Sequence, residues 1–188
     1  MLNHCSKKSG FTLIEVVIVV AIMGVLSTMG YSGLKTAVNN ARMKDYSLNL
    51  AAFLERIGND ATRMSKEFCV KMATNNEQEL LVFEPVDGSC NVDNPSELYD
   101  VFNLESPAKF GCGSASGSGS PDWAKNGAKF VPRIGLSAAP SEGYICMQYG
   151  VEFVYGLIEK KQNTNSIVPR WRTGELGAYW SDDSWYDL

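Results

Sequence analysis

The residues of this chain that could do chemistry are few, and their types exclude most catalysis. The 188 residues include one His, His4, so Ser-His-Asp and Cys-His arrangements have a single possible imidazole. No Gly-rich phosphate loop, Gly-x-Ser-x-Gly turn or histidine metal triad occurs. The chain has 17 Lys and Arg against 21 Asp and Glu, without the basic patch of a phosphate-backbone binder. We therefore expect neither an enzyme nor a nucleic-acid-binding protein.

Glu15 is the most unusual ionisable residue, because it lies inside an apolar run. The run extends from Phe11 to Leu34, follows Lys7 and Lys8, and has no other charged residue. As a helix it would be about 36 Å long, enough to cross a hydrocarbon core of about 30 Å. A carboxylate at mid-bilayer costs about 2.5–3.5 kcal/mol, and somewhat less near a helix end. We therefore expect Glu15 to have a partner and a function.

Three interpretations of this N-terminal segment compete. A secretory signal would be cleaved after the run at a small-x-small site, which Ser27, Gly30 and Ser32 approximate poorly. A plain signal anchor would stay uncut, with the two lysines held inside. Neither gives Glu15 a function.

The third interpretation rests on a resemblance. Lys7-Lys8-Ser9-Gly10 followed by Phe11-Thr12-Leu13-Ile14-Glu15 resembles the signature of type IV prepilins, which type IV pilins and type II secretion pseudopilins share. The resemblance covers about residues 6 to 34. It implies that a prepilin peptidase cuts after Gly10 and that the new N-terminal Phe11 is N-methylated. Many pilins carry Pro where this chain has Ser32, so a hinge at that position is not implied.

The resemblance also implies a location and partners. The leader, residues 1–10, would lie in the cytoplasm and take His4 and Cys5 with it. Residues 11–34 would span the inner membrane among lipids, and the globular part would be exported. The partners would be sister pilin or pseudopilin subunits and an inner-membrane assembly platform driven by a cytoplasmic ATPase. The filament would be an extracellular pilus or a periplasmic pseudopilus.

The expected role of Glu15 is to set the register of assembly. Cleavage would leave Phe11 with a charged α-amino group that methylation keeps basic. In a staggered helical bundle, the Glu15 carboxylate of one subunit can reach the Phe11 ammonium of its neighbour. In a low-dielectric seam each charge would then have a partner, which fixes axial register more than it adds net stability.

A second helical segment, residues 35–66, continues the apolar one and positions the rest of the chain. Its apolar residues recur every three or four positions and form one stripe. The stripe consists of Met43, Tyr46, Leu50, Phe53, Ile57, Ala61 and Met64. We expect one helix from Phe11 to about Ser65, whose second half packs on the remaining residues.

After the helix the apolar period changes to two, which is typical of strands. Phe68 to Met72, a polar turn at residues 74–77 and Leu80 to Phe83 indicate a β-hairpin. The further strand candidates are Leu98 to Leu104, Lys129 to Ile134 and Tyr144 to Ile158, the last with bulges or breaks at Gly150 and Gly156. Residues 111–121 have the composition of a flexible Gly/Ser loop. The prediction is an α+β, pilin-like fold, with an antiparallel sheet in a head of residues 67–188.

Four cysteines remain outside the leader: Cys69, Cys90, Cys112 and Cys146. An even count fits an exported domain, and four allow three pairings. We favour Cys69–Cys90, because the hairpin brings Cys69 opposite the end of its second strand. Cys112–Cys146 would then tether the Gly/Ser loop. A zinc site is the alternative, but no Cys-x-x-Cys spacing supports it. Many type IV pilins pair two cysteines near the C-terminus, and this chain has none after Cys146.

The C-terminal residues offer two further possibilities. Asp182, Asp183 and Asp187 are candidates for calcium, although the Gly- and Asp-rich loop of major pseudopilins does not occur, and a solvated acidic tail is the alternative. No other cofactor is expected. A group of aromatic residues could bind sugar rings, as in a filament-borne adhesin, or fill the core of a small sheet: Trp123, Trp171, Tyr179, Trp180, Trp185 and Tyr186. The main prediction remains a structural filament subunit, either of a pilus or as a minor pseudopilin that supports protein export.

Overall fold

The computed structural model describes residues 10–90, 92–93, 95–111, 123–132, 135–137, 144–150, 154–160, 167–173 and 186–188. The chain divides into two compact units, residues 1–38 and 39–188. One helix, α1 (Leu13–Met64), belongs to both, and it confirms the long N-terminal helix expected from the apolar run and the apolar periodicity.

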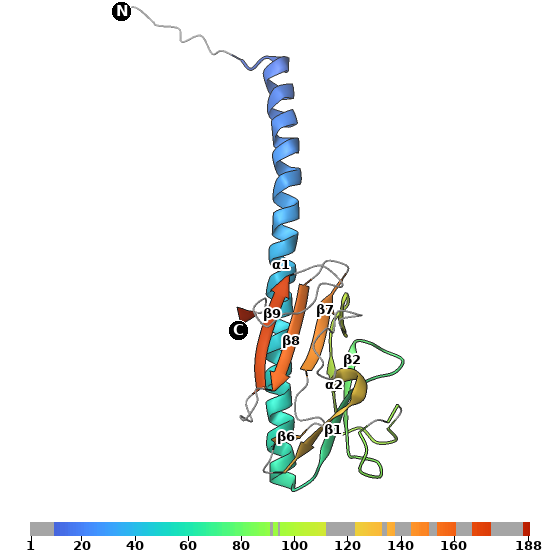
Figure 1. The fold of residues 1–188 in the computed structure, drawn as a ribbon. Coiled ribbons are helices and arrows are strands. Elements are labelled where there is room, and N and C mark those ends of the chain that lie inside the picture. The colour runs from blue at the N-terminus through green and yellow to red at the C-terminus, as the bar shows by residue number, and fades with distance from the viewer. Residues whose placement is uncertain are drawn as a thin grey trace, which may run out of the picture. The chain divides into compact units, whose positions relative to one another are not determined.

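The first unit consists of the apolar part of α1, drawn in blue in Figure 1. Its large apolar side chains are between 40% (Val38) and 89% (Phe11) exposed, so nothing in the described structure covers them. By length and composition, α1 can cross a membrane. Because burial of apolar surface drives folding and association, this surface needs lipid or other protein around it.

The second unit contains two antiparallel sheets. The first has the order β3-β2-β1-β5-β6, and the second has the order β10-β9-β8-β7-β4. The first is formed by β1 (Phe68–Met72), β2 (Glu79–Phe83), β3 (Asp100–Asn103), β5 (Ala128–Val131) and β6 (Gly135–Ser137). The second is formed by β4 (Ala108–Phe110), β7 (Tyr144–Tyr149), β8 (Val154–Lys160), β9 (Ile167–Thr173) and β10 (Tyr186–Asp187). A four-residue helix, α2 (Trp123–Asn126), precedes β5.

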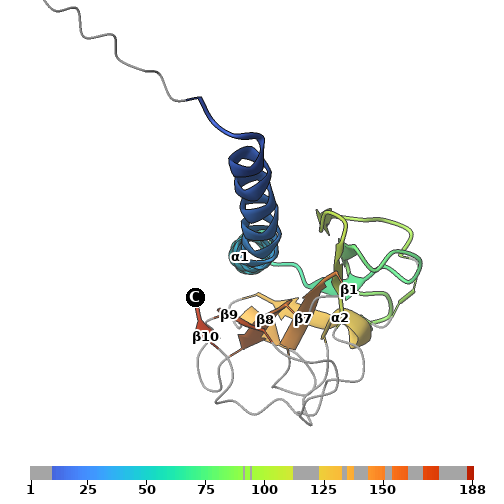
Figure 2. The same ribbon diagram turned by 90° about the horizontal axis from the view of Figure 1, so that it is seen from above.

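Both sheets pack against the second half of α1, and Figures 1 and 2 show them on the same side of it. Met43, Leu50 and Ile57 on the helix are completely buried. They share one apolar cluster with residues of both sheets, among them Phe68, Val70, Leu80, Val82, Phe130, Ile145 and Met147. The observed class is therefore α+β with antiparallel sheets against the helix, as the change of period predicted.

The predicted stripe on α1 is confirmed except at its last member. Met43, Leu50, Phe53, Ile57 and Ala61 are buried and Tyr46 is partly buried against the same cluster, whereas Met64 is 40% exposed. Met64 is the last residue of α1, and Ser65 follows with a positive φ of 53°. The chain turns towards β1 directly after Met64. The stripe therefore ends with the helix, and the Met64 side chain stays partly exposed.

The strand candidate Tyr144 to Ile158 is interrupted as expected at Gly150, but not at Gly156. The segment forms two antiparallel strands, β7 and β8, with Gly150 directly after β7 at a φ of +60°. Gly156 is no break, because it pairs in regular register with Met147. β9 was not predicted, because its Pro169 and two arginines interrupt an apolar pattern. The predicted loop at residues 111–121 lies outside the described residues, apart from the buried Gly111.

Gly127 marks a close approach between two segments of the head. It follows α2 with a φ of +80°, and a Cβ there would lie 2.6 Å from the carbonyl oxygen of Cys90. Gly88 has a similar φ of +75°, but a Cβ on it would meet nothing within 4 Å. The two glycines thus separate the effect of backbone conformation from that of close packing.

We predict that Gly127→Ala destabilises the head more than Gly88→Ala. Both substitutions strain a left-handed backbone, but only the first drives a methyl group into the Cys90 backbone, which costs about 1–3 kcal/mol more. For a chain of this size, the Tm of Gly127→Ala should be lower by about 3–10 °C than that of Gly88→Ala. Thermal unfolding by circular dichroism checks this, and equal Tm values would contradict the close packing.

Candidate functional site

The N-terminal end of α1 is closed by a capping box formed by Thr12 and Glu15. A Glu15 carboxylate oxygen accepts hydrogen bonds from the backbone N–H and the hydroxyl of Thr12, both at 2.8 Å. In return, the backbone N–H of Glu15 donates to the Thr12 hydroxyl oxygen at 3.4 Å. This reciprocal pattern satisfies backbone donors that the first turn of a helix leaves without partners. Glu15 therefore has partners within its own chain.

Sequence reasoning missed the role of Thr12, although the signal was present. A Thr followed three residues later by Glu, at the start of an apolar run, is the pattern of a capping box. The charge of Glu15 also lies in the first turn of α1, where the helix dipole favours an anion. The cap explains how the chain accommodates a carboxylate so close to apolar residues.

The peptide bond between Gly10 and Phe11 lies before the helix. Residues 10–12 have no regular secondary structure, and both Gly10 and Phe11 are exposed. A Cβ on Gly10 would meet nothing within 4 Å. A protease needs its substrate's backbone accessible and outside a helix, so this bond has the geometry of a cleavable one. Gly10, Phe11 and Glu15 thus lie within one short exposed stretch.

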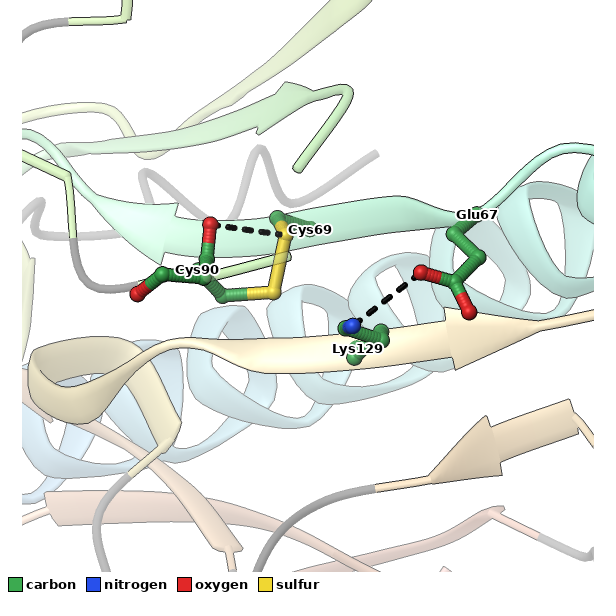
Figure 3. The surroundings of a disulfide bond; sticks show 5 residues. Glu67, Cys69, Cys90 and Lys129 are labelled. Carbon is green, nitrogen blue, oxygen red and sulfur yellow. Dashed lines mark hydrogen bonds and ion pairs between the residues drawn. A yellow bond between two sulfur atoms is a disulfide. The ribbon is translucent and has the colours of Figure 1, made fainter. Parts of the chain in front are cut away.

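The favoured disulfide, Cys69–Cys90, is present. Cys69 lies on β1 opposite Lys129 of β5, and an ion pair of 3.0 Å joins Lys129 to Glu67 beside it (Figure 3). Cross-strand partners point to the same face of a sheet, so the disulfide and the ion pair share the face turned away from the α1 core. Closing a loop of 21 residues stabilises a chain by about 3–4 kcal/mol in the chain-entropy model.

Cys146 on β7 is also disulfide-bonded. Its expected partner, Cys112, lies outside the described residues, so the second pairing stays a prediction.

A buried lysine lies two residues after Cys69 on the same face of β1. The Lys71 side chain is only 7% exposed, and its Nζ lies 2.8 Å from an Asp93 carboxylate oxygen. Asp93 itself is 72% exposed. The pKa of the Asp93 carboxyl is lowered, because the Lys71 ammonium donates a hydrogen bond to it and lies beside its charge.

The remaining candidates fall largely outside what the structure describes. Asp182 and Asp183 are not described, and Asp187 is described only as part of β10, so the calcium prediction stays untested. Within the described ranges, no three His, Cys, Asp or Glu side chains are grouped to hold a metal ion. Trp171 and Tyr186 are paired in register between β9 and β10, but their side chains are not described.

The arrangement fits a membrane-anchored, exported subunit: an uncovered apolar helix with an exposed cleavable bond before it, followed by a disulfide-bonded α+β unit. Residues 5–31 match the family model for the prokaryotic N-terminal methylation motif, the signature of type IV pilins and pseudopilins. The match covers Gly10, Phe11 and Glu15 and confirms the resemblance found in the sequence. No curated protein and no solved structure was found to match the chain.

The Lys71–Asp93 pair leads to a pH-dependence with a definite sign. Because the folded pKa of Asp93 is depressed, its contribution to stability is complete above the ordinary Asp pKa of about 3.9 and is lost as the pH falls through the folded value. We predict that wild type is more stable than Asp93→Asn at about pH 6 and that the difference shrinks towards about pH 2.5.

Thermal unfolding of both proteins across this pH range measures the difference. Asp87→Asn is the control, because Asp87 makes no ion pair with any described residue. A difference between wild type and Asp93→Asn that stays constant down to the lowest pH would contradict the prediction.

Proposed function

We propose that this chain is a structural subunit of a type IV filament, polymerised through α1. The observation that carries the proposal is the coincidence of the methylation motif at residues 5–31 with an apolar helix that nothing in the described structure covers. Lipid would cover residues 11–34 in the precursor, and other subunits would cover them in the filament. The head, residues 67–188, would be exported, and the leader, residues 1–10, would remain in the cytoplasm.

Processing would begin at the Gly10–Phe11 bond. A prepilin peptidase would cut it, and methylation would follow on the new α-amino group of Phe11. The exposure of Gly10 and Phe11 before the helix supports this step. After cleavage, a cationic N-terminus would lie next to the Thr12 cap, at the end of α1 where the helix dipole disfavours a cation. A carboxylate from a neighbouring subunit would relieve this unfavourable position.

The proposal assigns Glu15 two successive roles. In the precursor it accepts two hydrogen bonds from Thr12 and completes the cap. In the filament, the Glu15 carboxylate of one subunit would pair with the Phe11 ammonium of the next and thereby select one axial register. Apolar helices can slide past one another at little cost, so a single charge pair is an effective way to fix their stagger.

The filament could be a surface pilus or the pseudopilus of a secretion system, because both use the same N-terminal signature. Neighbouring genes distinguish them. A secretion ATPase and a secretin beside this gene would favour the pseudopilus, whereas a retraction ATPase would favour the pilus. Both alternatives have the same prepilin peptidase, sister subunits and inner-membrane assembly platform as partners. In neither is the chain an enzyme.

We predict that co-expression with a prepilin peptidase yields a chain that begins at N-methylated Phe11. The cleavable bond is exposed and precedes the helix, so the enzyme can reach it. Mass spectrometry of the purified membrane fraction measures the N-terminal peptide. A chain that keeps residues 1–10 in the presence of an active, matching peptidase would refute the proposal.

We also predict that Glu15→Gln separates processing from assembly. Gln keeps an oxygen that can accept from Thr12, so the cap and cleavage at Gly10 should persist, but it has no charge for the Phe11 ammonium. An ammonium without its partner in an apolar seam costs several kcal/mol, so sheared filaments should fall about tenfold or more. Immunoblots of sheared and membrane fractions measure this, with Ser27→Ala as control. Wild-type filament yield would contradict the register role.

A further inference from the structure

The outer face of the first sheet is covered by an irregular segment between β2 and β3. We call this segment the strap, and it consists of the described residues 84–90, 92–93 and 95–99. The strap begins with a turn closed by Val86 and Ser89 and ends where the Tyr99 N–H donates to the Val82 carbonyl at 2.7 Å. Within its described residues it forms no helix and no strand. Its middle therefore depends on side-chain ties to the sheet.

Two such ties lie next to each other. Cys90 is bonded to Cys69, and Asp93 pairs with Lys71 at 2.8 Å. Cys69 and Lys71 are two residues apart on β1 and so point to the same face. The Thr74 hydroxyl also donates to the Asp93 carbonyl at 3.2 Å. The covalent tie thus holds the strap at the place where the ionic tie forms.

The strap covers apolar residues as well as the lysine. Cys69, Ala73, Leu81 and Phe83 are buried in a separate apolar cluster, and Val92 of the strap packs against it. If the middle of the strap moved away, Leu81 and Phe83 would lose cover, and the Lys71 ammonium would lose the Asp93 carboxylate. A buried charge that loses its counter-charge is strongly destabilising, so a partly open strap is unfavourable.

We propose that the strap is a redox-locked cover, in which the Cys69–Cys90 disulfide and the Lys71–Asp93 ion pair close as one coupled unit. Reduction of the disulfide by a dithiol gives two thiols on the protein and a cyclic disulfide on the reductant, and it releases the ion pair together with the covalent tie. The reduced chain then exposes Lys71 and the apolar cluster beneath the strap. The inference concerns the unassembled subunit and does not depend on its role in a filament.

Coupling between two ties is reciprocal. If the disulfide holds Asp93 near Lys71 at a high effective concentration, the ion pair must in turn hold Cys90 near Cys69. Two consequences follow: removal of the disulfide should expose Lys71, and removal of the Asp93 charge should make the disulfide easier to reduce. A disulfide that acts only by restricting the unfolded chain would cause neither in the folded state.

The first experiment measures the accessibility of Lys71 in the full chain in detergent micelles. An N-hydroxysuccinimide ester acetylates lysines in wild type and in Cys69→Ser/Cys90→Ser, and mass spectrometry reports each site. We expect Lys71 to react about tenfold faster or more in the variant, because its side chain loses its cover. Lys109, 44% exposed and paired with Glu77, is the internal control and should react equally in both. Continued protection of Lys71 in a folded variant would overturn the proposal.

The second experiment keeps the disulfide, and it decides the question if the double-serine variant does not fold. The rate at which dithiothreitol reduces Cys69–Cys90 is measured by alkylation and mass spectrometry in wild type, Asp93→Asn and Asp87→Asn. We expect reduction to be several times faster in Asp93→Asn and unchanged in Asp87→Asn, which removes a strap carboxylate that makes no described ion pair. Equal rates in wild type and Asp93→Asn would overturn the proposal.

Discussion

The structure depends on one constraint: a single helix carries two apolar surfaces, one in each half, and the two sheets cover only the second. The second half of α1 buries Met43, Leu50 and Ile57 completely against the two sheets. The apolar residues of the first half have no cover within the described chain. Folding of the described part of the head therefore leaves the apolar run without cover. Under the proposed function, membrane insertion and polymerisation would be two solutions to the same problem, and one segment would serve both.

An entirely apolar helix would solve that problem without specificity, because apolar surfaces attract one another in many registers. In the proposed filament Glu15 would add the specificity, since a charge is costly in an apolar seam unless its partner is in place. The Thr12 cap makes this charge tolerable in the single subunit, because two donors of the same chain already satisfy one carboxylate oxygen. The carboxylate is thus held ready in a position that requires no rearrangement of the helix.

Much of this could be predicted from the sequence because local patterns decide it. The period of 3.6 in residues 43–61 determined the helix face, and the alternation at Phe68 to Met72 determined the hairpin that brings Cys69 to Cys90. The errors have non-local causes. Of the two interruptions expected in Tyr144 to Ile158, only Gly150 is one, because Gly156 pairs with Met147 inside the sheet. β9 contains Pro169, whose carbonyl accepts from the N–H of Leu188 beside the two-residue edge strand β10. Since the N–H and C=O of one residue point to the same neighbour in an antiparallel sheet, the missing N–H faces this edge and removes no hydrogen bond from the pairing with β8. The division into two sheets depends on how the strands pair and pack on α1. The sequence of a single strand does not determine these long-range contacts.

The strap, too, is not ordered by a local pattern, and this explains where the disulfide lies. The described residues of the strap form a long connection without helix or strand, and such a segment loses much conformational entropy when it is ordered. Val92 packs against the outer apolar cluster and Tyr99 stacks on Phe68, and these contacts offset only part of that loss. A covalent tie at Cys90 lowers the entropy of the open segment before the weaker contacts form, so the ion pair at Lys71 can close at little further entropic cost. The buried lysine then makes partial opening unfavourable, since a displaced strap would leave its charge without Asp93. The two ties therefore have complementary effects. The disulfide lowers the entropy of the open strap, and the ion pair makes a partly open strap unfavourable.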